Sequence, residues 1–193
     1  MKRIAVVIVT ILVTGCSSDD GMNRYATLEK QELGSHKKVD SLFLGLYFGM
    51  TQKQFYARCW NMNQQGILRD GSDGRGNMYV LYTLDSALHY PADMNFYPDF
   101  SNGTISRMRV NVQYKAWAPW NKKLFADSLL PDVLQLLKKW YPAGNDFIKV
   151  SDKKRGAIFI RIDGNRRITV GKYDDMIVKI DYTDLLQEKQ MRE

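Results

Sequence analysis

Residues 104–114 alternate between apolar and polar side chains, and this pattern limits the possible folds more than any other feature of the chain. The apolar positions are Met108, Val110, Val112 and Tyr114. The positions between them are Arg107, Arg109, Asn111 and Gln113. Because successive side chains of a strand point to opposite faces, the pattern predicts a long strand of an antiparallel sheet with one face on a core.

Similar patterning predicts further strands and two helices. The expected strands lie at about 78–84, 94–98, 147–150, 157–162, 166–171 and 176–183, and residues 42–48 form an extended lead-in. A helix is expected at about 52–65, because Thr51 and Gln54 have the spacing of a capping box and Gly66 supplies a stop. A second helix is expected at about 129–141, with Pro131 in its first turn.

The order of these elements predicts an α+β fold. We expect one domain over residues 41–186, made of two halves, 41–114 and 117–186. Each half consists of one helix followed by an antiparallel meander, and the helices pack on one sheet face. Residues 69–77 are expected as a glycine-rich surface loop, since their spacing does not fit a calcium loop. Residues 187–193 are expected as a polar tail.

The N-terminus has the pattern of a secretory signal peptide. Lys2 and Arg3 precede an apolar run from Ile4 to Val13, followed by Thr14 and Gly15. The run is too short to cross the roughly 30 Å hydrocarbon core of a bilayer as a helix. We therefore expect residues 1–15 to be a removable signal rather than a membrane anchor.

Cys16 directly follows Thr14-Gly15, and the site resembles the lipobox of bacterial lipoproteins. The resemblance implies cleavage by signal peptidase II and a lipid anchor on Cys16, with palmitate among its acyl chains. Ser17 at the next position implies the outer membrane. Asp19-Asp20 resembles an acidic surface-export signal, so periplasmic and cell-surface display both stay open. The polar residues that follow predict a flexible tether over 16–40.

Charge and cysteine content fit this location. The chain carries a net charge of +7, and its positive excess lies in the second half. In a cell envelope this charge indicates a protein, an anionic glycan or a lipid as partner, and excludes nucleic acid. With Cys16 acylated, Cys59 remains as the only thiol, so no intramolecular disulfide is expected. Its spacing from Phe55 and Met62 predicts a buried, unreactive thiol.

The sequence carries no common motif of a hydrolase, zinc or nucleotide site. We therefore expect no enzyme, no cofactor and no metal. His36 and His89 are interpreted as structural, and the tryptophans around the second helix as core residues rather than a sugar platform. An envelope glycan-binding protein, or a hydrolase with paired carboxylates, is the alternative. Its candidate acids are Asp93, Asp99, Asp146, Asp174, Asp175, Asp181 and Asp184.

Gly49-Met50-Thr51 followed by Gln54 is similar to the helix start of the SmpA/OmlA lipoproteins, which are related to the β-lactamase-inhibitor-protein-like fold. This resemblance covers a short part of the chain. It implies a non-catalytic envelope module that binds other proteins through its sheet.

A candidate interaction face follows from the alternation of the strands. If the alternating apolar residues of the strands pack against the helices, the cations between them lie on the other face of the sheet. Two apolar residues at the same alternate positions as the cations would lie on that face with them. The set comprises Arg107, Arg109, Phe159, Arg161, Arg167, Ile177 and Lys179. The alternative is a solvated face with cross-strand pairs, such as Arg161 or Lys179 with Asp181.

Overall fold

The computed structural model describes residues 19–72, 78–152 and 156–191. Four α-helices, one short 3-10 helix (η1) and eight strands occur in these ranges. In chain order they are α1 (Asp19–Gly34), α2 (Gln52–Gln64), β1 (Leu68–Ser72), β2 (Met78–Leu84), β3 (Ala92–Ser101), β4 (Thr104–Tyr114), η1 (Lys122–Leu124), α3 (Ala126–Trp140), β5 (Ile148–Asp152), β6 (Gly156–Asp163), β7 (Arg166–Lys172), β8 (Val178–Asp184) and α4 (Leu185–Gln190).

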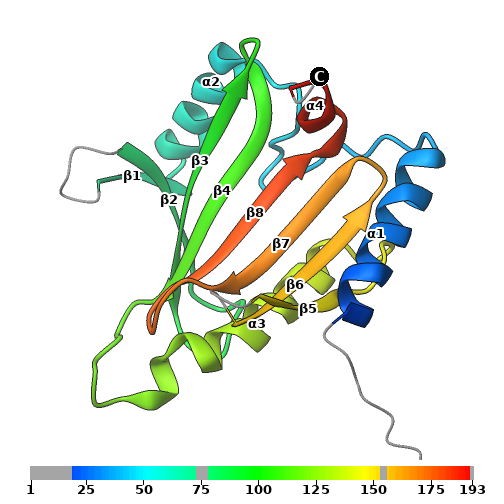
Figure 1. Cartoon of the computed structure of the whole chain (residues 1–193). Helices are drawn as coiled ribbons and strands as arrows, with labels where there is room; N and C mark the ends of the chain where they lie inside the picture. The colour runs from blue at the N-terminus through cyan, green and yellow to red at the C-terminus, as the bar shows by residue number, and fades with distance from the viewer. Residues whose placement is uncertain (1–18, 73–77, 153–155, 192–193) are drawn as a thin grey trace, which may run out of the picture.

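All eight strands form one antiparallel sheet in the order β1-β2-β3-β4-β8-β7-β6-β5 (Figure 1). The predicted class, helices with an antiparallel sheet, is confirmed. The alternation predicted for residues 107–114 is also confirmed, because Met108, Val110, Val112 and Tyr114 are buried while Arg109 and Asn111 are exposed.

The main core lies on one face of the sheet, which we call the core face. The alternate residues of β4, β7 and β8 point to it, and α3 packs on these three strands. Phe55 and Met62 of α2 join the same core, as does the apolar segment 42–50. The predicted capping box at the start of α2 is confirmed: Gln54 N–H donates to Thr51 Oγ1, and Thr51 N–H donates to Gln54 Oε1.

Helix α1 packs against β5 and β6 at one end of the sheet (Figure 1). Tyr25, Leu28 and Leu33 cover a second, smaller core on the opposite face of the sheet, which we call the second face. The buried members of this core are Ile148, Val150, Ile160, Ile162 and Leu185. Two sequence predictions are therefore wrong: residues 19–34 are not a flexible tether, and the helices do not all pack on one face.

Other differences are smaller. Strand β1 occupies part of the stretch expected as a loop, residues 73–77 of which lie outside the described residues. Helix α3 begins at Ala126, so Pro131 lies inside the helix and not in its first turn. Helix α4 includes residues 187–190 of the expected polar tail. Within the described ranges, no helix is long and apolar enough to cross a membrane.

Candidate functional site

Two central strands, β4 and β8, carry charged side chains on the second face of the sheet. Arg107 forms an ion pair with Asp181 at 2.9 Å, and Lys179 lies 3.7 Å from the same carboxyl group. Arg109 pairs with Asp99 of β3 at 2.7 Å, and its side chain is 51% exposed. We call these five residues, together with the exposed Asn111 between them, the central patch.

The central patch carries both charge signs, with Arg107, Arg109 and Lys179 beside Asp99 and Asp181. Each cation of the patch has an acidic partner on a neighbouring strand or on its own strand. The alternative noted for Lys179, a pair with Asp181, is present. The exposed Arg109–Asp99 pair is of a kind that contributes only about 0–1 kcal/mol to stability, so these two charges are free to exchange their partners for those of a docked molecule.

Arg167 also lies on the second face, but beneath α1. Its guanidinium donates to Glu188 of α4 at 2.9 Å and to the Tyr25 hydroxyl of α1 at 3.1 Å. The Tyr25 hydroxyl in turn donates to Glu29. Arg167 therefore fastens the two terminal helices to the sheet and is not part of an accessible surface.

Phe159 and Arg161 lie on the core face, contrary to the prediction. The register of β6 against β7 places Phe159 opposite Val170 and Arg161 opposite Ile168. The alternate apolar residues of β6, Ile158, Ile160 and Ile162, instead face α1, because that helix covers the second face at this end of the sheet. Alternation alone could not reveal this reversal, since it does not specify which face each helix covers.

Ile177 is also placed differently from the prediction. It precedes β8 in a turn, where its N–H donates to Asp174 Oδ1 at 2.7 Å. Of the seven predicted face residues, the structure therefore brings together Arg107, Arg109 and Lys179. Cys16, the predicted lipidation site, lies outside the described residues.

A buried network of charges surrounds Asp163 at the end of β6, and the sequence prediction missed it. The Asp163 carboxylate accepts hydrogen bonds from Arg161 Nε at 2.9 Å, Arg166 at 3.0 Å and Asn145 N–H at 2.7 Å. Arg161 and Arg166 also donate to the carbonyl oxygens of Tyr141 and Ser41. The two arginines flank the predicted turn at residues 163–165, which is the only signal that the sequence offered.

The same turn attaches the N-terminal part of the chain to the sheet. Glu32 of α1 accepts hydrogen bonds from Gly164 N–H at 2.7 Å and from the Asn145 side chain at 2.9 Å. Val39 N–H donates to Asn165 Oδ1 at 2.6 Å. The carboxylate of Glu32 and the turn therefore hold α1 in place in addition to its apolar contacts.

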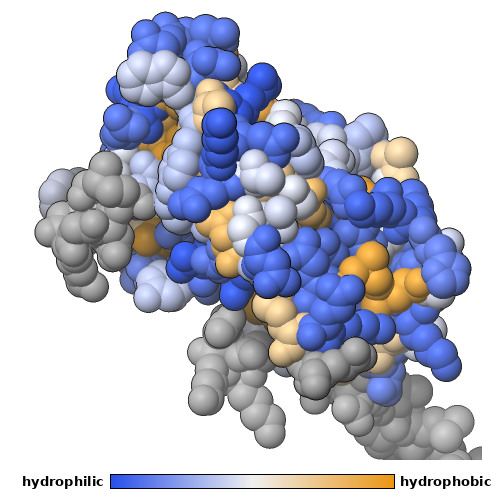
Figure 2. All heavy atoms as spheres, turned by 90° about the horizontal axis from the view of Figure 1, so that it is seen from above, coloured by the Kyte–Doolittle hydropathy of each residue, from blue (hydrophilic) through white to orange (hydrophobic). Residues whose placement is uncertain are grey.

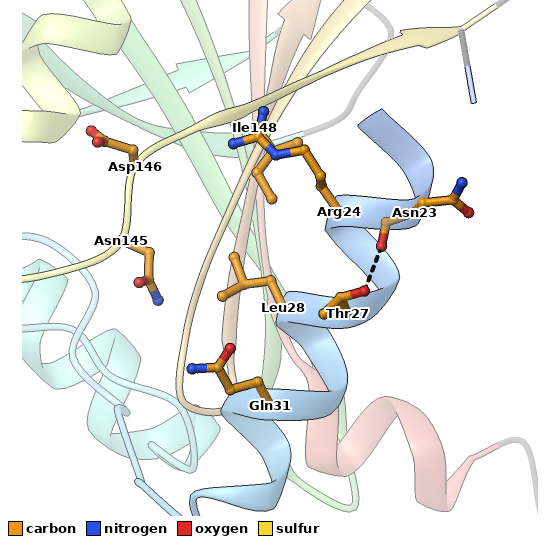
Figure 3. Close-up of a pocket in the computed structure, with 8 residues that line it drawn as sticks. All are labelled: Asn23, Arg24, Thr27, Leu28, Gln31, Asn145, Asp146 and Ile148. Atoms are coloured by element: carbon orange, nitrogen blue, oxygen red, sulfur yellow. Dashed lines mark hydrogen bonds between the residues drawn. The ribbon is translucent and has the colours of Figure 1, made fainter. Parts of the chain in front are cut away.

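A cavity of about 440 Å³ lies between α1 and the loop before β5 (Figure 3). The side chains of Gln31 and Asn145 point toward one another across it, and Leu28 lies between Gln31 and Ile148. The Asp146 carboxylate points away from α1 and lies 3.4 Å from Lys138. The Asn145 amide donates to Glu32 of α1 and to the Ile162 carbonyl, so this lining residue helps to hold α1.

His89 and Asp132 form a pair that sequence reasoning also missed. The Asp132 carboxylate is bonded to His89 Nδ1 at 2.5 Å, accepts from His89 N–H at 2.9 Å and accepts from the Tyr114 hydroxyl at 2.8 Å. Burial alone would raise the pKa of Asp132, but the hydrogen bonds from His89 and Tyr114 more than offset it, so this pKa is lowered. The His89 side chain is 74% exposed, and the bonds from His89 to Asp132 tie the loop before β3 to α3.

Two features bear on reactivity and surface character. The Cys59 thiol is partly buried, and this burial raises its pKa to about 11, so little thiolate forms at neutral pH.

Within the described residues, no group of three or more potential metal ligands occurs. On the side drawn in Figure 2, hydrophobic residues form small separate areas within a mostly hydrophilic surface.

The chain was compared with models of protein families, with curated proteins and with solved structures. None of the three comparisons finds a match.

Proposed function

We propose that this protein is a lipid-anchored module of a bacterial cell envelope that binds another protein through the central patch. The anchor is supported by the lysine and arginine, the apolar run and the small residues that precede Cys16. Three peptide units separate Cys16 from the start of α1, and they span at most about 11 Å. An outer-membrane anchor on Cys16 would therefore hold the folded domain close to the lipid surface.

The exposure of the central patch is the observation that supports binding at this place. β4 is one of the two middle strands of the sheet, yet Arg109 and Asn111 of this strand are exposed on the second face. At the β5–β6 end, the same face is covered by α1. An exposed sheet surface with both charge signs fits a protein partner with complementary charges better than an anionic glycan or lipid.

The arrangement of the elements supports a comparison with the SmpA/OmlA lipoproteins. α2 precedes the four-stranded meander β1–β4, and α3 precedes the meander β5–β8, with β4 and β8 paired at the centre. We interpret this as two equivalent halves. The Gly49-Met50-Thr51 helix start, which resembles that family, adds to the proposal of a non-catalytic binding module.

The lipid anchor is tested by replacing Cys16. Because several acyl chains give stable membrane attachment, Cys16→Ser should move the protein from the membrane fraction to the soluble fraction. Intact-mass measurement should show the lipid on the wild-type protein. Membrane attachment of the serine variant, or an unmodified mass of the membrane-bound form, would contradict the anchor.

The central patch is tested by exchanging one ion pair. In the double variant Asp99→Arg/Arg109→Asp the pair is kept with its polarity reversed, so stability should change by less than about 1 kcal/mol. Recovery of a crosslinked envelope protein should nevertheless fall strongly. An unchanged crosslink in this folded variant would contradict docking at the patch. The exchange Lys138→Asp/Asp146→Lys, in the pair that lies 3.4 Å apart outside the patch, is the matched control.

A further inference from the structure

A small pocket lies near the end of α3, away from the central patch. Its volume is about 280 Å³, and its lining comes from the segment 42–44, from β2 and from the C-terminal end of α3. Four of the six lining residues are aromatic: the set is Leu42, Phe43, Leu44, Tyr82, Trp140 and Tyr141. The Phe43 and Trp140 rings lie 5.9 Å apart at an angle of 31°. Tyr82 and Trp140 supply partly exposed aromatic surface, Phe43 and Tyr141 are buried, and none of the six lining residues is charged.

One wall of the pocket is a strained turn. Leu44 has a φ of +54° and Gly45 a φ of +72°, and the turn is closed by a hydrogen bond from Leu46 N–H to the Phe43 carbonyl at 2.9 Å. Glycine adopts such a conformation readily, whereas a leucine in it is unfavourable. Strained residues of this kind cluster at ligand sites, where the surrounding structure holds them.

Arg58 of α2 holds this turn in place. Its Nε and one terminal nitrogen donate to the Leu44 carbonyl at 3.2 Å and 3.0 Å. A Cβ at Gly45 would lie 2.7 Å from the Arg58 guanidinium, so the arginine packs directly against the turn. The unfavourable backbone at Leu44 is thus fixed by a side chain from a different element, as expected for a preformed wall.

Two of the lining residues carry a polar atom, the Tyr82 hydroxyl and Trp140 Nε1. Among the hydrogen bonds of the described residues, none involves the Tyr82 hydroxyl or Trp140 Nε1, and neither atom is completely buried. Tyr82 and Trp140 are each half-buried. A purely hydrocarbon ligand would remove these atoms from water without a partner, which is unfavourable.

We propose that this pocket binds one pyranose ring of a neutral sugar. A sugar ring has apolar C–H faces that pack on aromatic rings, and hydroxyl groups at its edge that can pair with a tyrosine hydroxyl and an indole N–H. The uncharged lining disfavours phosphates and carboxylates. This site is separate from the proposed protein-binding patch and does not depend on it.

The test uses ligand-observed saturation-transfer NMR on the purified protein. The probes are methyl α-glucopyranoside, methyl α-mannopyranoside, methyl β-galactopyranoside and N-acetylglucosamine, each at about 10 mM, a concentration that detects a weak site with a Kd near 1 mM. Cyclohexanol serves as an apolar ring of similar size. We expect saturable binding of at least one sugar and weaker binding of cyclohexanol.

The variants connect binding to the pocket. Tyr82→Phe removes a single oxygen atom and should weaken sugar binding about two- to tenfold without unfolding the protein. Trp140→Phe should weaken it by a similar factor. Trp120→Phe is the matched control, because Trp120 is 84% exposed and outside the pocket, and it should leave binding unchanged. No binding of any sugar, preferential binding of cyclohexanol, or equal effects of Trp140→Phe and Trp120→Phe would overturn the proposal.

Leu44 gives an independent readout. Asn tolerates a positive φ better than Leu, so Leu44→Asn should raise the melting temperature by about 2–8 °C while weakening sugar binding through the lost side-chain contact. A lower melting temperature or undiminished binding in this variant would contradict a turn that is strained to form the pocket wall.

Discussion

The buried network around Asp163 allows a quantitative prediction about stability. Asp163→Ala leaves Arg161 and Arg166 buried next to each other without their shared acid, and it removes three hydrogen bonds. Removing one partner of a buried ion pair costs about 3–5 kcal/mol. Because each kcal/mol shifts the melting temperature of a domain of this size by about 2–4 °C, the expected decrease is about 6–20 °C.

Comparison with Arg161→Met tests the electrostatic reasoning. That variant removes one of the two cations and leaves Asp163 paired with Arg166 at 3.0 Å, so neither of the two remaining charges lacks a partner. Methionine retains much of the arginine's apolar volume. We therefore expect a smaller loss than in Asp163→Ala, and less than about 1 kcal/mol for Asp99→Ala in the exposed pair.

Urea unfolding followed by circular dichroism measures all three variants. An Arg161→Met variant as unstable as Asp163→Ala would refute the account, as would a loss below about 1 kcal/mol for Asp163→Ala.

Three further predictions concern single sites. Thr51→Ala removes the hydroxyl that accepts from Gln54 N–H, whereas the backbone N–H of residue 51 can still donate to Gln54 Oε1. The change should cost about 0.5–2 kcal/mol in urea unfolding, and an unchanged midpoint would show that the cap contributes nothing. Because the folded-state pKa of Asp132 is lowered, its contribution is present at neutral pH and is lost as the pH falls through that pKa below about 4. The difference in unfolding free energy between wild type and Asp132→Asn should therefore shrink from pH 7 to pH 3, and a constant difference would contradict this. Cys59, with its raised pKa, should react with iodoacetamide at pH 8 much more slowly than in urea, and equal rates would exclude its burial.

The elements that local signals specify could be predicted from the sequence. The Thr51-Gln54 spacing located the start of α2, and strict alternation located β4, because both patterns depend on residues close in the chain. The strand β1 was missed because its sequence, which includes Asp70 and Gly71, has the composition of a loop. Pairing with β2 determines its conformation.

Errors about the candidate site have a common cause in tertiary packing. The apolar residues of α1 are too sparse to indicate a buried helix, so Tyr25, Leu28 and Leu33 were assigned to a tether. Because α1 covers the second face, the alternate apolar residues of β6 point to that face, and Arg161 therefore points to the core face. The pairing of Asp132 with His89 joins residues far apart in the chain, so no local sequence pattern predicts it.

The central claim, that another envelope protein docks on the middle of the sheet, is tested most directly by site-specific photocrosslinking in intact cells. A photoreactive amino acid at Asn111, which is exposed on β4, is compared with one at Gln135, which is exposed on α3. We predict one discrete adduct at Asn111 that mass spectrometry identifies as an envelope protein, its loss in the Asp99→Arg/Arg109→Asp variant, and no such adduct at Gln135. The absence of an adduct at Asn111, or the same adduct from both positions, would contradict docking at the central patch.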